Sequence, residues 1–412
     1  MERTFEQNLD AYAHLIINTG CNVQPGQELF ISSDIANAQL VRLLVAEGYR
    51  VGASNVTVHW TDEQVSRMHY DNRPLEAWSQ FPEWQAELQN GVARRGAALL
   101  FIDSEDPYGM TGVDPRKFAA RTKAAHEACK EWRRGMDFGL NVWCIVGAAS
   151  PAWASRVFPD LPVEEAVGKL WDAIFATVRV NTPDPDAAWM AREKDFKRHA
   201  DWLNGLGLDR LHYTNGIGTE LTVGLNADGL WEAGGGYTKG GTFFFPNMPT
   251  EEVFSTPDRE RVDGIVYSAL PLNHDGTLID RFWVRFEGGR AVECGAEQGQ
   301  EALQSIIDTD EGSHYLGECS LVPKESPIHQ SGILFLSTLF DENAACHLAL
   351  GMGFPECLKG GLDMSKDDLL AAHVNQSATH VDFMVGTDDL TVTGFTHDGR
   401  EVPIFVDGTW AE

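Results

Sequence analysis

The segment from Thr379 to Gly386 contains two residues that could act together chemically, His380 and Asp382. The pattern of this segment predicts a β-strand, in which alternate side chains point to the same face. The two residues would then lie about 6 to 7 Å apart along the strand and could bind one metal ion. A pair of solvent-facing or hydrogen-bonded polar side chains is the alternative interpretation.

A second candidate is His347, in the segment from Asp341 to Gly351. Asp341 is typical of a helix N-cap and Gly351 of a helix C-terminal stop, so we expect a short helix with His347 near its end. Glu342 would lie about 140° from His347 around that helix and could share a site only from a distorted first turn. An ordinary helix with a surface histidine is the alternative.

Two carboxylates, Glu252 and Glu318, lie next to apolar segments that are typical of β-strands. A carboxylate directed into a core is costly unless it is paired, hydrogen-bonded or bound to a metal. Each residue could instead be a solvated acid on an edge strand. The position of these two carboxylates therefore suggests, without establishing, a buried site.

Other catalytic motifs are missing from the sequence. It contains no G-x-S-x-G elbow, no H-E-x-x-H helix and no Walker loop. The glycines of residues 234–241 do not follow the G-x-G-x-x-G spacing of dinucleotide-binding loops, so we expect turns there.

The predicted elements divide the chain of 412 residues, a length that favours two domains. Strand, helix and strand patterns over residues 28–60, an apolar run at 98–102 and a further strand at 140–146 predict an α/β domain with a mainly parallel sheet. Two prolines within residues 181–186 break the helical pattern, so we expect domains 1–185 and 186–412. The second reads as an α+β domain with a mainly antiparallel curved sheet, because short β-rich runs alternate with Gly and Asp turns.

The composition restricts partners and location. The net charge of -29, from 32 basic and 61 acidic residues, disfavours binding to nucleic acid or to anionic membranes. The seven cysteines show no C-x-x-C spacing, which fits a reducing compartment. The first residues do not resemble a signal peptide, and no apolar run is long enough to span a bilayer. We expect a cytoplasmic protein.

Four segments together resemble the aminopeptidase T, aminopeptidase S and PepS family of dinuclear metallo-aminopeptidases, in order and in spacing. They are residues 249–254, 316–318, 341–351 and 380–386. The resemblance extends over nearly the whole chain and includes residues 21–27 and 112–115. It implies an N-terminal α/β domain, a C-terminal domain that holds two divalent ions, and a homodimer that encloses a large cavity.

By motif position, the resemblance also implies a set of site residues. The implied metal ligands are Glu252, Glu318, His347, His380 and Asp382, with Glu342 as a weaker candidate. Glu318 is the expected bridge between the ions. One position departs from the family, which commonly has a Tyr seven residues after the histidine of the 341–351 segment, where this chain has Phe354.

The activity implied is removal of N-terminal residues from peptides by a metal-activated water, with Zn, Co or Mn as the ions. Two close cations lower the pKa of a bridging water, polarise the carbonyl and stabilise the oxyanion. Glu318 would take part in catalysis as the bridging ligand. Glu251 is our candidate for a general base or a contact to the substrate amine, and a solvated acid is the alternative.

Two other functions remain open at this point. His347, His380 and Asp382 could form the ligand triad of a mononuclear Fe(II) ring-cleaving dioxygenase, and a group of dihydroxypyridine dioxygenases resembles the peptidases in these C-terminal motifs. Glu252 and Glu318 favour two metals over one. A catalytically silent binding protein is the third possibility, supported only by Phe354.

Overall fold

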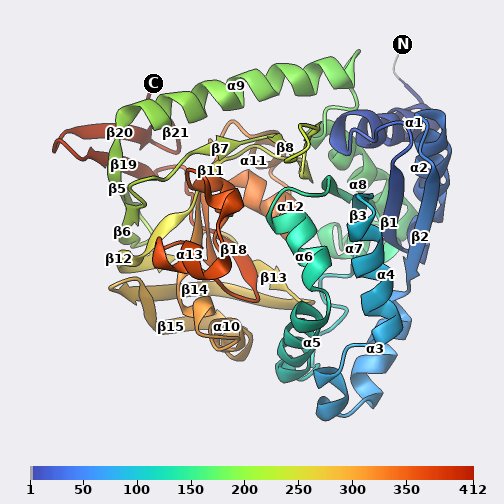
Figure 1. The fold of residues 1–412 in the computed structure, drawn as a ribbon, viewed down its shortest axis with the longest axis horizontal. Coiled ribbons are helices and arrows are strands. Elements are labelled where there is room, and N and C mark those ends of the chain that lie inside the picture. The colour runs from blue at the N-terminus through green and yellow to red at the C-terminus, as the bar shows by residue number, and fades with distance from the viewer. Residues whose placement is uncertain (1–2) are drawn as a thin grey trace.

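The computed structural model describes residues 3–412. Its N-terminal half contains a five-stranded parallel sheet, seen with its helices on one side of the molecule in Figure 1. In spatial order the strands are β10 (Asn247–Met248), β4 (Trp143–Gly147), β3 (Ala98–Asp103), β1 (Glu28–Asp34) and β2 (Asn55–Thr61). The mainly parallel α/β fold expected for this half is therefore confirmed. β10 comes from beyond residue 185, so the second half of the chain supplies an edge strand to this sheet.

Helices cover both faces of the parallel sheet, which explains the uninterrupted apolar run of β3. Leu100 packs into a core with residues of α1 (Phe5–Leu15), α2 (Ala38–Arg50) and α8 (Val163–Thr177). Its neighbour Leu99 points to the opposite face and packs against α4 (Glu83–Arg94) and α6 (Lys130–Asp137). Alternate residues of one strand thus enter two different cores. The other helices of this half are α3 (Glu63–Asn72), α5 (Pro115–Ala128) and α7 (Pro151–Val157).

The second half is built on two larger antiparallel sheets, as expected. One sheet has nine strands: β13 (Leu272–His274), β14 (Thr277–Glu287), β12 (Pro257–Tyr267), β6 (Glu220–Leu225), β5 (Leu208–Thr214), β19 (Thr391–Thr396), β20 (Glu401–Val406) and β21 (Thr409–Trp410) in order, with β15 (Arg290–Gln298) paired to β14. The other, called here the site sheet, is ordered β18 (His380–Met384), β17 (His347–Gly351), β16 (Leu316–Leu321), β11 (Val253–Ser255) and β7 (Glu232–Ala233). A separate small ribbon pairs β8 (Gly236–Tyr237) with β9 (Phe243–Phe244).

One face of the site sheet packs against the nine-stranded sheet. Leu348, Leu350, Val381 and Phe383 belong to the same buried cluster as side chains of β5, β6 and β14. Strand alternation then turns the residues between them, such as Asp382, toward the other face. The apolar residues of β17 and β18 therefore form a core on one side and leave the other side for polar groups.

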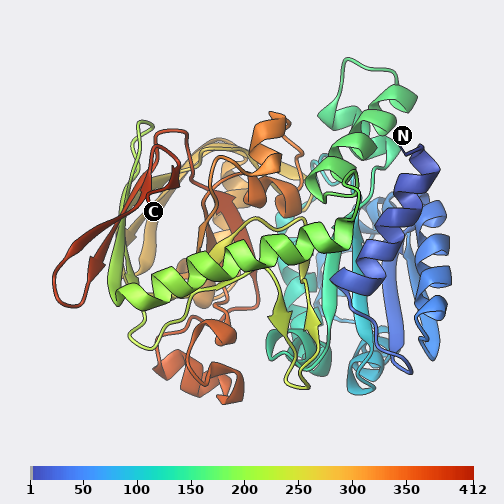
Figure 2. The ribbon, with the colours of Figure 1, turned by 90° about the horizontal axis from the view of Figure 1, so that it is seen from above.

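The long helix α9 (Pro185–Leu206) joins the two halves and runs across both (Figures 1 and 2). It begins with Asp184 as N-cap and Pro185 in the first turn, and it ends at Gly207 in a left-handed conformation. It packs against α1 at one end and against β7 and β11 of the site sheet further along. The remaining helices are α10 (Gln300–Ile307), α11 (Pro327–Ser331), α12 (Thr338–Asp341) and α13 (Lys366–Ala371). Across residues 3–412, no helix combines the length and apolarity needed to cross a bilayer.

The prediction of a short helix between Asp341 and Gly351 is wrong. α12 ends at Asp341, one 3-10 turn covers Glu342–Ala344, and His347–Gly351 form strand β17, which lies between β18 and β16 in the site sheet. Asp341 precedes the 3-10 turn, but its side chain does not cap it, because the carboxylate accepts hydrogen bonds from the preceding backbone N–H groups of Phe335 and Ser337, at 2.8 and 3.2 Å. Pairing on both sides of β17 overrides the helix propensity of its Ala and Leu residues.

Candidate metal centre

The register of the site sheet gathers the predicted ligands on one face. On β17, His347 lies opposite Ser320 of β16, and Ala349 lies between Glu318 of β16 and Asp382 of β18. His347 and Ala349 are two residues apart and point to the same side, as do Glu318 and Ser320. The prediction that His380 and Asp382 share a face of one strand agrees with this register.

Small residues on β17 make room for the ligands at either side. Ala349 separates Glu318 from Asp382, and Gly351 lies opposite His380. Gly351 has φ +112°, and a Cβ atom there would lie 2.1 Å from the carbonyl oxygen of Thr379. Only glycine fits this position without displacing the backbone of the segment that carries His380.

Five of the six predicted ligands form two groups that share one residue. Glu252, Glu318 and His347 have ligand atoms within 4.8 Å of one another, and so do Glu318, His380 and Asp382. His347 Nε2 lies 2.9 Å from Glu252 Oε2 and 3.8 Å from Glu318 Oε1. His380 Nε2 lies 3.0 Å from Glu318 Oε2 and 3.3 Å from Asp382 Oδ1. Glu318 thus offers one carboxylate oxygen to each group.

The orientation of the two imidazole rings fits metal ligation. The Nδ1 atoms of His347 and His380 face the carbonyl oxygens of Ala345 and Met352, at 3.2 and 2.7 Å. Carbonyl oxygens only accept hydrogen bonds, so each Nδ1 carries a hydrogen and each neutral ring has its lone pair at Nε2. Both lone pairs point at carboxylate oxygens about 3 Å away, an arrangement that needs a proton or a metal ion between the atoms.

The electrostatics of the site also favour a cation. Burial raises the pKa of Glu252. Burial opposes ionisation of Glu318 as well, but hydrogen bonds from His347 and His380 hold the pKa of Glu318 well below its ordinary value. Burial lowers the pKa of both imidazoles, yet the adjoining carboxylates outweigh it and raise these pKa values well above the ordinary one. Within residues 3–412, these carboxylates pair only with histidines, and neither Lys nor Arg comes within 4.0 Å of them.

The two groups differ in their access to solvent. The side chains of His347 and Glu318 are 1% and 4% exposed, whereas those of His380 and Asp382 are 24% and 13% exposed. His380 is therefore the most exposed of these side chains, followed by Asp382 and by Glu252, which is 10% exposed.

Ser320 is a contributor that the motif analysis missed. Its hydroxyl oxygen lies 2.9 Å from Glu252 Oε2 and 2.6 Å from Glu318 Oε1, and the residue is fully buried. Ser320 has a single hydroxyl hydrogen, so it lies between the two carboxylates and donates to one of them at a time. Strand alternation could have identified it, because it lies two residues after Glu318.

Glu342 lies beside the cluster and outside both ligand groups. It is 7% exposed, and Asn343 Nδ2 donates to it at 3.3 Å. Burial raises its pKa well above the ordinary value, and the charges of Asp382 and Glu252 add to this effect. It is a buried carboxylate without a cationic partner in the described chain, next to the expected metal ligands.

The structure does not bring Glu251 to the cluster. Its side chain is 1% exposed and forms ion pairs with Arg179, at 2.5 Å, and Arg192, at 3.0 Å. Because both carboxylate oxygens are engaged by guanidinium groups, this placement does not support the expected role as general base or amine contact. The alternative of a solvated acid is wrong too, since the residue is buried.

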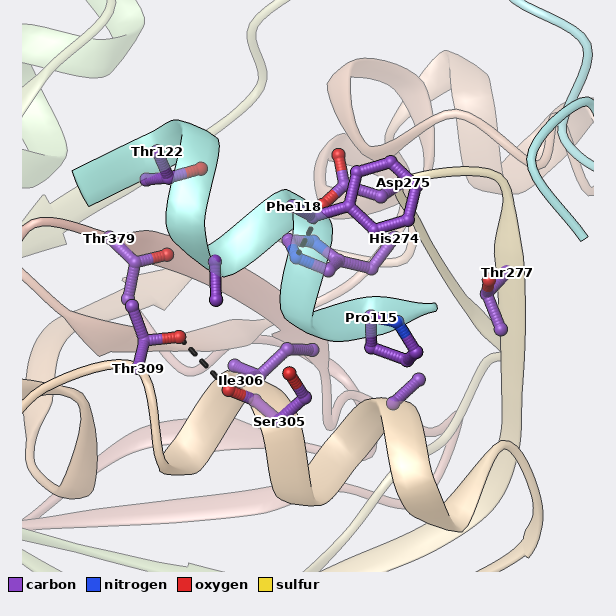
Figure 3. Close-up of a pocket in the computed structure, with 12 residues that line it drawn as sticks. Pro115, Phe118, Thr122, His274, Asp275, Thr277, Ser305, Ile306, Thr309 and Thr379 are labelled. Atoms are coloured by element: carbon purple, nitrogen blue, oxygen red, sulfur yellow. Dashed lines mark hydrogen bonds and ion pairs between the residues drawn. The ribbon is translucent and has the colours of Figure 1, made fainter. Parts of the chain in front are cut away.

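A small pocket of about 130 Å³ lies beyond β18, between the N-terminal half and α10 (Figure 3). Its wall is formed by Pro115 and Phe118 of α5, His274 at the end of β13, Asp275 of the turn that follows, and Ser305 and Ile306 of α10. Thr379, the residue before His380, also lines it, but none of the predicted ligands does. The chemistry of the site sheet is therefore separate from this pocket.

The protein joins a helix-covered parallel sheet to an antiparallel sheet. Three carboxylates and two imidazoles gather on the antiparallel sheet, and this combination defines a metalloprotein. Comparison with known families gives its kind, because residues 5–410 match peptidase family M29, described as thermophilic metalloproteases, and the chain belongs to that family. It is 42% identical to aminopeptidase AmpS of Bacillus subtilis over 99% of both chains. The solved structure of wild-type AmpT from Thermus thermophilus has a TM-score of 0.90 and 40% identity, covering 99% of this chain and 100% of that one.

A more distant structure carries the same fold. The 2,5-dihydroxypyridine dioxygenase of Pseudomonas putida KT2440 has a TM-score of 0.52 at 11% identity, over 99% of this chain and 98% of that one. Similarity at this level concerns the fold alone. Identity near 40% with aminopeptidases over almost the whole chain means that the dioxygenase alternative is not favoured.

Proposed function

We propose that this protein is a dinuclear metallo-aminopeptidase that removes N-terminal residues from peptides. The observation that carries the proposal is the position of Glu318, which offers one oxygen to each of two ligand groups. A single-ion site would use only one of these groups and leave the other with two buried carboxylates and a single histidine to offset them. Membership of a metalloprotease family and similarity to proteins named aminopeptidases support the same reaction.

Glu252 and His347 would hold one ion, His380 and Asp382 the other, and Glu318 would bridge them. Mixed imidazole and carboxylate ligands suit Zn, Co or Mn. When bound, two such ions supply Lewis acidity for the scissile carbonyl and a water of lowered pKa. The hydrogen bonds from the imidazole Nδ1 atoms to carbonyl oxygens fix both rings, which keeps each Nε2 directed into the site.

Two carboxylates of the protein, Glu318 and Glu342, would have different roles in the reaction. Glu318 orients both halves of the centre, with Ser320 as its hydrogen-bond partner. Glu342 stands outside both ligand groups, so we assign it the proton transfer that hydrolysis requires, from the attacking water to the leaving amine. Bound cations would offset the burial and the neighbouring carboxylates that raise its pKa, and would leave it ionised for this role. The peptide would enter from the more exposed side, past His380 and Asp382.

We also propose a cytoplasmic homodimer. All seven cysteines are free, which fits a reducing compartment. The dimer is supported by the family resemblance of the sequence and is tested by light scattering on the purified protein.

Metal stoichiometry and peptide turnover, measured on the same preparation, test the central proposal. Chelated protein should be inactive, and adding Zn²⁺, Co²⁺ or Mn²⁺ should restore hydrolysis of aminoacyl reporters as about two ions bind per chain. Binding of one Fe²⁺ with no peptidase activity would instead identify an oxygenase.

The role of Glu342 has its own test. Glu342→Gln should keep both ions and lower kcat by about 100-fold or more, the usual contribution of a positioned acid or base. Glu318→Gln is the matched comparison, because it should lose metal together with activity. Loss of metal from the Glu342 variant would make this residue a ligand.

A further inference from the structure

The carboxylate of Glu251 is held between two arginines that come from a different part of the chain. Arg192 lies on α9, and its Nε and Nη2 atoms are 3.1 and 3.0 Å from Glu251 Oε2. Arg179, in the connection between α8 and α9, reaches Oε1 at 2.5 Å. The two guanidinium groups thus approach different oxygens. Arg192 Nε donates a hydrogen bond to Oε2, whereas Arg179 lies at ion-pair distance from Oε1, which accepts no hydrogen bond.

The surroundings also restrain the conformation of each arginine. Arg179 has φ +61°, a left-handed conformation that is unfavourable for a residue other than glycine and must be maintained by its surroundings. The guanidinium of Arg192 lies over the ring of Phe196, 4.3 Å from its centroid. The arginine side chains are only 19% and 22% exposed, so the three charges are largely withdrawn from water.

The backbone of the same segment is fixed from the opposite side. The N–H of Glu251 donates to Asn343 Oδ1 at 2.7 Å, and Asn343 is fully buried. Asn343 in turn donates to the carbonyl of Leu339 and to Glu342. The residue before Glu252 is therefore tied by its side chain to α9 and by its backbone to the segment that precedes His347.

Glu252 follows immediately and points the other way. Its Oε2 lies 2.9 Å from His347 Nε2, whereas the neighbouring Glu251 carboxylate faces the arginines. The two residues directly precede β11, so anchoring the side chain of Glu251 restrains the backbone that directs Glu252 toward His347.

We propose that Arg179, Glu251 and Arg192 form a positioning clamp that aims Glu252 at the metal centre. The proposal rests on the dinuclear function above and adds residues that touch neither metal nor substrate. Without the Glu251 charge, two largely buried guanidinium groups lose their carboxylate partner beside Glu252, and the Glu252 segment loses its anchor on α9.

Metal affinity is the decisive measurement. Glu251→Gln should weaken binding of the Glu252 ion by about 10- to 100-fold in chelator competition, the usual effect of removing a partner behind a ligand. The Co²⁺ form should show an altered visible absorption spectrum, and added metal should restore most of kcat. Arg192→Lys, which keeps the charge but loses the two-pronged contact, should weaken the same ion by less.

Two controls separate positioning from general loss of stability. Ile174→Val truncates a buried core residue of α8, close in the chain to Arg179, and should lower Tm without changing metal affinity or the Co²⁺ spectrum. Glu28→Gln removes the carboxylate of another two-pronged arginine pair, with Arg95, far along the chain from the centre, and should leave both ions in place.

The possible outcomes are distinct. Wild-type metal affinity and an unchanged Co²⁺ spectrum in Glu251→Gln would overturn the clamp while leaving the dinuclear function intact. Loss of kcat with both ions bound and an unchanged spectrum would also overturn it and make Glu251 a catalytic base. If the wild-type protein binds no metal, the proposed function fails and the clamp fails with it.

Discussion

The ring of Phe354 lies against the imidazole of His380, with centroids 4.8 Å apart and planes inclined by 41°. Phe254 packs against Phe354 in a T-shaped arrangement, with ring centroids 5.4 Å apart. Position 354, where the family resemblance leads us to expect Tyr, therefore adjoins an expected metal ligand, on the side of the centre that is more open to solvent.

Phe354→Tyr should raise kcat for simple aminoacyl substrates or tighten metal binding. The ring is retained and one oxygen is added beside His380, where it can contact a metal or the developing oxyanion. Removing such a donor typically costs about 2.7 to 4 kcal/mol of transition-state stabilisation, which sets the upper limit of the gain. Phe254→Tyr adds the same oxygen one ring further away and is the control. Equal kinetics and metal affinity in Phe354→Tyr and the wild type would place the 354 side chain outside direct contact with the chemistry.

His380→Ala and Asp382→Ala should each lose one ion and nearly all hydrolysis while the fold is kept. Both side chains project from one face of β18 and contribute little to the apolar core on the other face. Metal analysis and circular dichroism check the two halves of this prediction. His373→Ala is a suitable control, because it removes a histidine that pairs with Asp258 at 3.0 Å elsewhere on the protein. Full metal content in either ligand variant would show that the site is assigned incorrectly.

Glu318→Gln should weaken both ions together. Each carboxylate oxygen of Glu318 serves a different group, and an amide offers only one oxygen, so both metals lose a charged ligand or a bridge. Isothermal titration with Co²⁺ or Zn²⁺ measures the two affinities. Glu252→Gln is the comparison, since it should weaken mainly the ion shared with His347. If one ion of Glu318→Gln bound as in the wild type, Glu318 would not be the bridge.

Strand periodicity was sufficient to predict part of this site. His380 and Asp382 lie on one face of β18, and the apolar run of β3 is covered on both sides, because both features follow from the two-residue repeat of a strand. The segment that contains His347 is the exception, because its Ala and Leu content and Asp341 are typical of a helix. Only its pairing with β16 and β18 makes it a strand.

Contacts between residues far apart in the chain could not be predicted from the sequence. β10 is a two-residue strand that pairs with β4, about 100 residues earlier, and no local pattern marks it. Glu251 was associated with the metal centre because it adjoins Glu252, but its side chain points to arginines on and before α9. Sequence adjacency in an extended segment places two side chains on opposite sides, and which side holds the site depends on the tertiary packing.

Glu193 should make the protein less stable as pH rises. Burial raises its pKa to about 7 from the ordinary 4.5, and the hydrogen bond from the Gly235 N–H, at 2.9 Å, opposes this effect only in part. Between these two pKa values the folded chain binds more protons at this site than the unfolded chain, so the free energy of unfolding falls as pH increases through that window.

Glu193→Gln should therefore stabilise the protein at pH 8.5, and less so at pH 5.5. The amide oxygen can still accept from Gly235, and no charge is buried. Because part of the side chain is solvated, we expect a gain on the order of 1 kcal/mol, or roughly 1 to 2 °C in Tm for a chain of this length. Glu127→Gln, at an exposed position of α5, is the control and should leave Tm unchanged at both pH values. Thermal unfolding of the wild type and both variants decides the matter: if Glu193→Gln shifts Tm equally at pH 5.5 and pH 8.5, then the stability change has a cause other than the ionisation of Glu193.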